Sequence, residues 1–140
     1  MSGAWVLATD GAARGNPGPA GAGGTLSDPQ GRRVEEFGVA LGSLTNNEAE
    51  YRALLLGLEA ARRRGVARLE VRLDSELVVR HLSGAYRVRA RHLRPLFEEA
   101  RRRIAAFEAC EVRHVPREQN AEADRLANAG IDGLSPGGAH

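Results

Sequence analysis

The chain has 140 residues, of which 42% are hydrophobic and 27% charged, a composition typical of one folded domain and not of a disordered segment. Its net charge is +2 and all 20 basic residues are arginine, so the lack of lysine excludes a P-loop, Schiff-base chemistry and a lysine general base. The single cysteine, Cys110, excludes an internal disulfide and a multi-cysteine zinc site.

The first part of the chain predicts three strands. Residues 4–10 predict a short buried strand that ends on the carboxylate Asp10, and a Gly- and Pro-rich loop over 11–19 follows it. Residues 20–27 and 32–41 flank an Asp-Pro-Gln-Gly turn signal and predict an antiparallel hairpin.

The middle of the chain predicts two helices around a strand. The Ala- and Leu-rich segment 46–64 predicts a helix that ends at a glycine. Residues 68–73 alternate between polar and apolar side chains and predict a strand that again stops at a carboxylate, Asp74. A short helix is expected over about 75–83.

The last part predicts a helix, a strand and a further helix. One helical face with a period of 3.6 residues is formed by Leu93, Leu96, Phe97, Ala100, Ile104 and Phe107. A strand over 111–115 and a helix over 120–131 follow. The Gly- and Pro-rich segment 133–140 predicts a disordered tail.

The predicted order is therefore β-β-β-α-β-α-α-β-α, which indicates an α/β fold. The three leading strands are expected to be antiparallel, and the two later strands, which arrive through helices, to be parallel. We expect a mixed five-stranded sheet with helices on both faces, in one domain over residues 1–132.

Carboxylates stand at the ends of two predicted strands. Asp10 and Asp74 occupy the carboxyl ends, where open α/β sheets place their sites. Neighbouring carboxylates repel one another unless a cation holds them, and Mg²⁺ prefers such oxygen ligands. Glu48 or Glu50, and Asp124, lie on helices that can reach the same end. Taken singly, each acid is better explained as a helix cap or a solvated surface charge.

Helix geometry separates the two neighbouring glutamates. Thr45 and Glu48 have the spacing of a capping box, which directs Glu48 back toward the backbone of Thr45. Glu50 lies about 200° around the helix from Glu48, in line with the small and apolar residues between Ala53 and Ala61. We therefore expect Glu50 to face the strand ends.

Four short motifs occur in one collinear order along the chain. They are Asp10-Gly11 with Arg14-Gly15-Asn16-Pro17-Gly18-Pro19, Thr45-Asn46-Asn47-Glu48-Ala49-Glu50-Tyr51, Leu73-Asp74-Ser75, and the run from His114 to Ala127. Together they resemble type 1 ribonuclease H, and the resemblance is closest to its compact archaeal-like bacterial branch. It covers about residues 4–132.

The resemblance implies a ribonuclease H-like fold and a metal-dependent endonuclease. Such an enzyme cuts the RNA strand of RNA–DNA hybrids by a two-metal-ion mechanism, with Mg²⁺ as the cofactor and Mn²⁺ as a possible substitute. The catalytic, metal-binding positions of the family map onto Asp10, Glu50, Asp74 and Asp124. His114 matches a histidine that assists proton movement or product release, and its alternative is an ordinary exposed loop histidine. The substrate contacts that the resemblance implies are Arg14, Gly15, Asn16, Asn46 and Asn47.

One departure from the family concerns the segment between Gly84 and Leu93, which is too short for the separate basic helix of some relatives. Its arginines, together with Arg94, either bind phosphate in place of that helix or form a solvated face.

Two other functions remain open: a catalytically silent nucleic-acid-binding module on the same fold, and an enzyme that also cuts double-stranded RNA. We expect a hybrid duplex as the partner, and neither a membrane nor an obligate protein partner. We also expect a cytoplasmic location, because no apolar run reaches the ~20 residues that span a bilayer and the N-terminus lacks a signal pattern.

Overall fold

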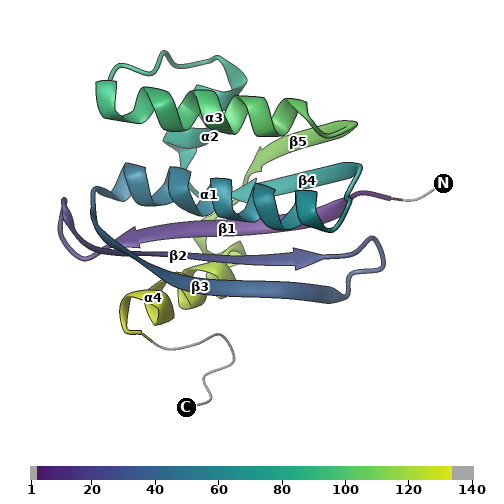
Figure 1. The fold of residues 1–140 in the computed structure, drawn as a ribbon, viewed down its shortest axis with the longest axis horizontal. Helices are drawn as coiled ribbons and strands as arrows, with labels where there is room; N and C mark the ends of the chain where they lie inside the picture. The colour runs from purple at the N-terminus through teal and green to yellow at the C-terminus, as the bar shows by residue number, and fades with distance from the viewer. Residues whose placement is uncertain (1–2, 134–140) are drawn as a thin grey trace.

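A computed structural model describes residues 3–133 as one five-stranded sheet covered by helices on both faces (Figure 1). The order across the sheet is β3-β2-β1-β4-β5. The three leading strands are antiparallel: β1 is Trp5–Ala13, β2 is Gly18–Ser27 and β3 is Arg33–Leu44. The later strands, β4 (Arg68–Leu73) and β5 (Ala109–His114), run parallel to β1. The predicted mixed sheet is confirmed.

The helices divide between the two faces of the sheet. On one face, α1 (Asn46–Arg63) packs on β1 and β2, and α3 (Arg94–Ala105) packs on α1. The short α2 (Glu76–Ser83) contacts β4 and β5. On the opposite face, α4 (Ala121–Ile131) packs on β2 and β3. Two 3-10 turns, η1 (Arg91–Leu93) and η2 (Arg117–Gln119), precede α3 and α4.

The prediction that the first strand ends on Asp10 is wrong. Parallel pairing of β1 with β4 reaches only Ala8, but antiparallel pairing with β2 continues to Ala13. Asp10 therefore lies in a strand that has already lost its parallel neighbour. Its side chain still stands beyond the carboxyl end of the parallel pair, where the sequence suggested a site.

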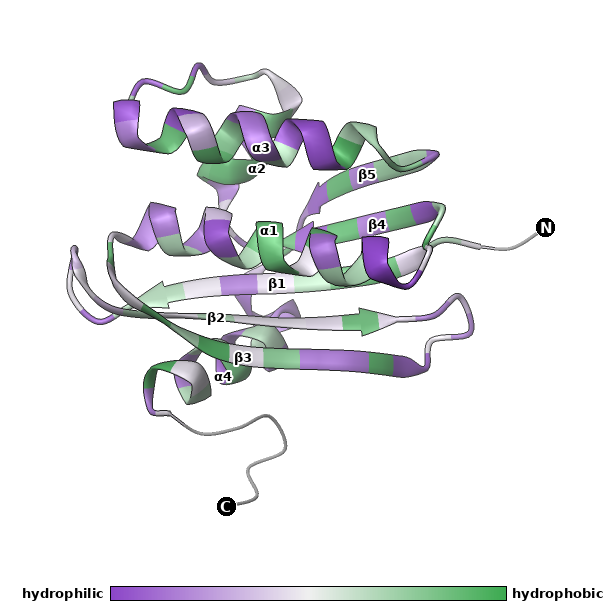
Figure 2. Cartoon of the chain, in the orientation of Figure 1, coloured by the Kyte–Doolittle hydropathy of each residue, from purple (hydrophilic) through white to green (hydrophobic). Residues whose placement is uncertain are grey.

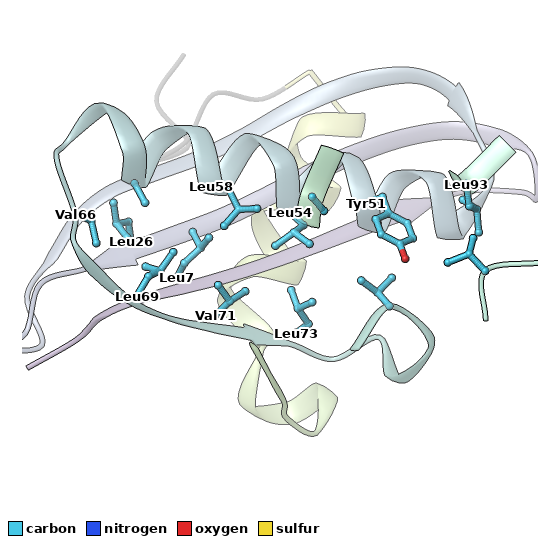
Figure 3. Packing of buried hydrophobic residues seen from close by; sticks show 14 residues of the cluster. Leu7, Leu26, Tyr51, Leu54, Leu58, Val66, Leu69, Val71, Leu73 and Leu93 are labelled. Carbon is cyan, nitrogen blue, oxygen red and sulfur yellow. The ribbon is translucent and has the colours of Figure 1, made fainter. Parts of the chain in front are cut away.

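The main core lies between the sheet and the helices α1, α2 and α3. Leucine, valine and alanine supply most of it, as the composition predicts, and Tyr51 is its largest fully buried side chain (Figure 3). Burying one leucine or valine side chain stabilises a fold by about 1.5–3 kcal/mol. Figure 2 shows hydrophilic residues on the outward turns of α1 and α3. The predicted apolar face of α3 packs against this core, including Phe107, which follows the helix.

Three smaller features complete the description of the fold. Cys110 is half-buried, and burial raises the pKa of its thiol to about 11, so it packs as a neutral side chain. The predicted disordered tail lies almost entirely outside the described residues, since these stop at Gly133. Within residues 3–133, no helix is both long and apolar enough to cross a membrane.

Candidate metal centre

Three carboxylates meet at the end of the sheet where β1 and β4 diverge. Asp10 comes from β1, Asp74 directly follows β4, and Glu50 comes from the first turns of α1. Each offers one oxygen, and the three oxygens lie within 4.8 Å of one another. Hard divalent cations bind such oxygen donors, so these three side chains fit a site for a hard divalent cation.

Glu50 reaches this cluster because α1 lies directly on β1. A Cβ atom on Gly11 would collide with the backbone of Ala49 and Glu50, so only glycine permits this approach. The backbone N–H of Gly11 donates to Glu50 Oε1 at 3.0 Å. Gly11, the residue after Asp10 in β1, thus holds the carboxylate of Glu50 in place.

Asp74 is held in place by a residue from the far end of the chain. Asn120, which is only 2% exposed, donates from Nδ2 to the carbonyl of Thr9 at 2.9 Å and to Asp74 Oδ2 at 3.3 Å. Its backbone carbonyl also accepts from the N–H of Asp124 at 3.1 Å. Asn120 therefore links the segments that carry three of the four predicted acids.

Asp124 approaches from the opposite face on α4. Glycines in β2 and β3 allow α4 to lie directly on the sheet, since a Cβ on Gly23 or Gly38 would collide with the α4 backbone. Asp124 lies outside the group of three oxygens within 4.8 Å, but it borders the same cavity, and its charge contributes to the raised pKa of Asp10. All four predicted acids are therefore at one site.

The protein raises the pKa of Asp10 to about 10. Burial is the largest cause, because Asp10 is only 5% exposed, and the charges of Glu50 and Asp74 add to it. A buried carboxyl group among like charges is favourable in its ionised form only when a cation compensates it.

Burial also raises the pKa of Glu50 to about 7. The Gly11 N–H opposes this shift because it stabilises the carboxylate, the charge of Asp74 adds to it, and nearby Arg117 lowers the value again. Both acids thus titrate far from their ordinary range, a common property of functional sites.

A cavity of about 350 Å³ opens onto these acids, and Arg117 is one of its walls. Neither Arg117 nor Asn120 was assigned a role from the sequence, although both lie in the motif run that begins at His114. The available signal was their place in that run, seven and four residues before Asp124.

The loop after β1 and the start of α1 are tied together at the rim of this cavity. The N–H of Asn46 donates to Asn16 Oδ1 at 3.0 Å, and the N–H of Ala13 donates to Asn46 Oδ1 at 3.2 Å. Asn46 also lines the cavity, and Gly15 lies exposed in the same loop. Of the predicted substrate contacts, Asn46 is thus beside the acids, and Asn16 is hydrogen-bonded to it.

The other two predicted substrate contacts, Arg14 and Asn47, are not among the described residues that line this cavity. The Arg14 guanidinium turns toward the end of α4 and donates to both carboxylate oxygens of Asp132, at 2.6 and 3.2 Å, and to Asn128 Oδ1 at 3.3 Å. Asn47 lines a separate groove next to the cavity.

His114 is exposed at the end of β5 and pairs in register with Leu73, the residue before Asp74. Within the described chain, it does not line the cavity that holds the acids.

Sequence comparison identifies relatives over nearly the whole chain. A family model described as Reverse transcriptase-like matches residues 8–130. Ribonuclease HI of Halobacterium salinarum is 45% identical over 123 residues, which are 88% of this chain and 62% of that protein. The bifunctional protein Rv2228c of Mycobacterium tuberculosis is 41% identical over 128 residues, 91% of this chain and 35% of that protein. The chain thus spans less than two thirds of the length of these relatives.

Solved structures agree with these matches. The crystal structure of RNase H1 from the halophilic archaeon Halobacterium salinarum has a TM-score of 0.91 at 42% identity, covering 94% of this chain and all of that chain (100%). LC11-RNase H1, crystallised in complex with an RNA/DNA hybrid, has a TM-score of 0.87 at 40% identity, covering 92% of this chain and 97% of that chain.

Proposed function

Because this chain belongs to the type 1 ribonuclease H family, we propose that it hydrolyses the RNA strand of RNA–DNA hybrids with the help of divalent cations. One observation carries the proposal: three carboxylate oxygens lie within 4.8 Å of one another beside an open cavity. The hybrid in the crystal of LC11-RNase H1 supports the choice of substrate.

In this proposal, Asp10, Glu50, Asp74 and Asp124 hold two Mg²⁺ ions, with Mn²⁺ as a possible substitute. Bound divalent cations supply an activated water and stabilise the leaving oxygen of a phosphodiester. The protein orients the acids through Gly11 and Asn120, and Arg117 balances the negative charge from the cavity wall.

The rim of the cavity is proposed to recognise the hybrid. A hybrid differs from duplex DNA by the 2′-hydroxyl groups of one strand, so its recognition requires hydrogen-bonding groups near the minor groove. Gly15, Asn16 and Asn46 supply amide and backbone groups at this rim, and the hydrogen bond from the N–H of Asn46 to Asn16 Oδ1 holds these two residues in a fixed geometry. We propose that Arg14 anchors this loop to α4 through Asp132, which orients the neighbouring substrate contacts.

His114 is proposed to assist proton transfer or product release from outside the cavity. An exposed position at a strand end suits a group that approaches the substrate only once the substrate is bound. Because general acid–base help is worth about 10²–10⁴-fold, His114→Ala is expected to slow turnover about a hundredfold at most and not to abolish it.

The alternative of a silent binding module is disfavoured by the acids themselves. A protein that only bound nucleic acid would gain nothing from burying Asp10 among other carboxylates, because this arrangement raises the cost of ionisation and repels phosphate.

A cleavage assay tests the proposed function. We would incubate the protein with an end-labelled RNA–DNA hybrid, double-stranded RNA or double-stranded DNA, each with Mg²⁺, Mn²⁺ or EDTA. We expect cleavage of the RNA strand of the hybrid with either metal, and Asp10→Asn as the inactive control. Cleavage that persists in EDTA would contradict the metal centre. The double-stranded RNA samples determine the substrate breadth.

A further inference from the structure

A buried hydrogen bond joins the two helices that adjoin the carboxylates of Glu50 and Asp74. His81 of α2 is 4% exposed, and its Nδ1 lies 2.7 Å from the hydroxyl of Tyr51 of α1, which is completely buried (0% exposed) in the core (Figure 3). Among residues 3–133, no other hydrogen bond links α1 to α2. Both helices also bury apolar side chains in the shared core, but apolar packing is not directional.

The direction of this hydrogen bond follows from burial. In the described part of the chain the Tyr51 hydroxyl has no second partner, so its O–H is satisfied only when it donates to His81 Nδ1. Burial also lowers the pKa of His81, which favours the neutral ring that can accept at Nδ1. The rings of Tyr51 and His81 stack with centroids 6.0 Å apart, and the ring of Phe97 on α3 meets His81 edge-on at 6.3 Å. Two neighbouring helices therefore hold His81 in one orientation.

Each residue of this pair is connected to one of the acids through a short stretch of helix. Tyr51 directly follows Glu50 in α1. His81 lies in α2, and this helix begins after its N-cap Ser75, which is the residue next to Asp74. The side chain of Ser75 caps the helix, so α2 starts immediately beyond the carboxylate. The hydrogen bond thus connects the two segments that carry Glu50 and Asp74.

Glu50 and Asp74 require such a connection because their charges oppose close approach. Their carboxylate oxygens lie within 4.8 Å of each other, so the two ionised groups repel when no cation is bound. The hydrogen bonds that orient these side chains come from Gly11 in β1 and from Asn120 before α4, and neither of them joins α1 to α2. The bond between Tyr51 and His81 resists this repulsion directly.

We propose that the hydrogen bond between Tyr51 and His81 positions Glu50 and Asp74 for cation binding, because it holds α1 and α2 at their observed spacing. This inference rests on the proposed function, since it concerns the same metal centre. Within the described chain neither residue of the pair lines the cavity that holds the acids, so both are positioning residues. Ligands that are already in place lose less conformational freedom on binding, and the cation binds more tightly.

Calorimetric titration of the metal-free protein with Mg²⁺ alone tests this connection without nucleic acid or cleavage. Tyr51→Phe keeps the ring and removes only the hydroxyl. We expect its Mg²⁺ affinity to fall about fivefold, which is the size of one hydrogen bond. Val66→Ala is the matched control, because Val66 lies in the same core beyond the opposite end of α1 (Figure 3). This control should lose stability but keep the Mg²⁺ affinity of the wild type.

Two substitutions of His81 separate the hydrogen bond from the packing of the ring. His81→Leu removes the acceptor and should weaken Mg²⁺ binding as much as Tyr51→Phe does. His81→Asn keeps an acceptor oxygen near the position of Nδ1 and should retain most of the affinity. The double variant Tyr51→Phe/His81→Leu should bind Mg²⁺ no more weakly than either single variant, because both changes break the same bond.

The inference fails if Tyr51→Phe melts at a lower temperature, as Val66→Ala should, but binds Mg²⁺ as the wild type does, since the pair would then only pack the core. It also fails if His81→Leu and His81→Asn bind Mg²⁺ with equal affinity, and this comparison decides the outcome if Tyr51→Phe does not fold. A wild type that binds Mg²⁺ but does not cleave the hybrid would contradict the proposed function alone. A wild type that binds no Mg²⁺ would contradict both.

Discussion

Two glutamates separated by one residue have different surroundings at the start of α1. Thr45 Oγ1 accepts from the N–H of Glu48 at 3.2 Å, and the N–H of Thr45 donates to Glu48 Oε1 at 2.8 Å, which completes the predicted capping box. Glu50 instead accepts from the N–H of Gly11 and belongs to the carboxylate cluster. This division follows from residue spacing alone, since helix geometry determines which way each side chain points.

The first prediction compares the two glutamates in matched variants. Glu50→Gln is expected to lose more than about a hundredfold of the hybrid-cleaving activity, because an amide is a poor ligand for a divalent cation. Its stability should change little, since glutamine still accepts from Gly11. Glu48→Gln should remain active, because glutamine also completes a capping box. Initial rates with Mg²⁺ and thermal melting provide the measurements, and an inactive Glu48→Gln with an active Glu50→Gln would contradict the assignment.

The second prediction concerns the pH dependence of stability without metal. The pKa of Asp10 is about 10 in the folded protein and near 3.8 when unfolded, so the folded state retains a proton that the unfolded state releases. The contribution of Asp10 to stability is therefore greatest at low pH and declines as the pH rises from about 4 toward 10. Glu50, with a pKa raised from 4.5 to about 7, adds to the decline below neutral pH.

Urea unfolding in EDTA at pH 5, 7 and 9 measures this decline. Asp10→Asn should flatten the pH dependence and be the more stable protein at pH 9, because asparagine cannot ionise. A wild type that becomes more stable in EDTA from pH 5 to pH 9 would show that the cluster is not strained by its own charge.

At the scale of elements, local sequence patterns predicted the bounds of helices and strands better than they predicted contacts between distant segments. Strand β4 was predicted with its observed bounds, because its alternating side chains and the following Asp74 are all local signals. The predicted C-terminal end of β1 was wrong because antiparallel pairing with β2 determines where β1 ends. Pairing between strands depends on residues outside the strand itself, so the sequence of β1 alone does not reveal it. The position of Asn120 beside Thr9 and Asp74 was equally inaccessible, since these contacts join residues 111 and 46 positions apart.

The third prediction tests how the sheet positions α4. Gly23→Ala places a methyl group against the backbone of α4 near Ala123, so the helix must move and carry Asp124 with it. Such overpacking costs about 1–3 kcal/mol of stability. We also expect a higher Mg²⁺ concentration for half-maximal activity. Gly3→Ala is the control, because among residues 3–133 the only neighbour within 4 Å of its Cβ is the side chain of Pro29, at 3.8 Å. If Gly23→Ala keeps both wild-type stability and metal dependence, close packing does not position Asp124.

At the scale of the molecule, the acids of the candidate metal centre come from the sheet and from helices on both of its faces. They come from β1, from α1 on one face, from the end of β4 and from α4 on the other face. Without a cation, these elements bring like charges close together. A bound cation would instead connect the elements, because their carboxylates would share it. Cation binding should therefore stabilise the whole fold and not only the site.

The fourth prediction is that Mg²⁺ raises the melting temperature. At a hundredfold excess over its dissociation constant, a ligand that binds only the folded state adds about 2.7 kcal/mol, which corresponds to roughly 5–10 °C for a chain of this size. The increment should grow with the logarithm of the Mg²⁺ concentration and be smaller at pH 5 than at pH 8, because binding must first displace the proton of Asp10. NaCl at equal ionic strength is the control for simple screening of the acids. Asp10→Asn should begin with a higher metal-free melting temperature at pH 8 and gain little from Mg²⁺. If NaCl produced the same rise as Mg²⁺, or if Asp10→Asn responded as the wild type does, the four acids would be a charged surface cluster and not a cation site.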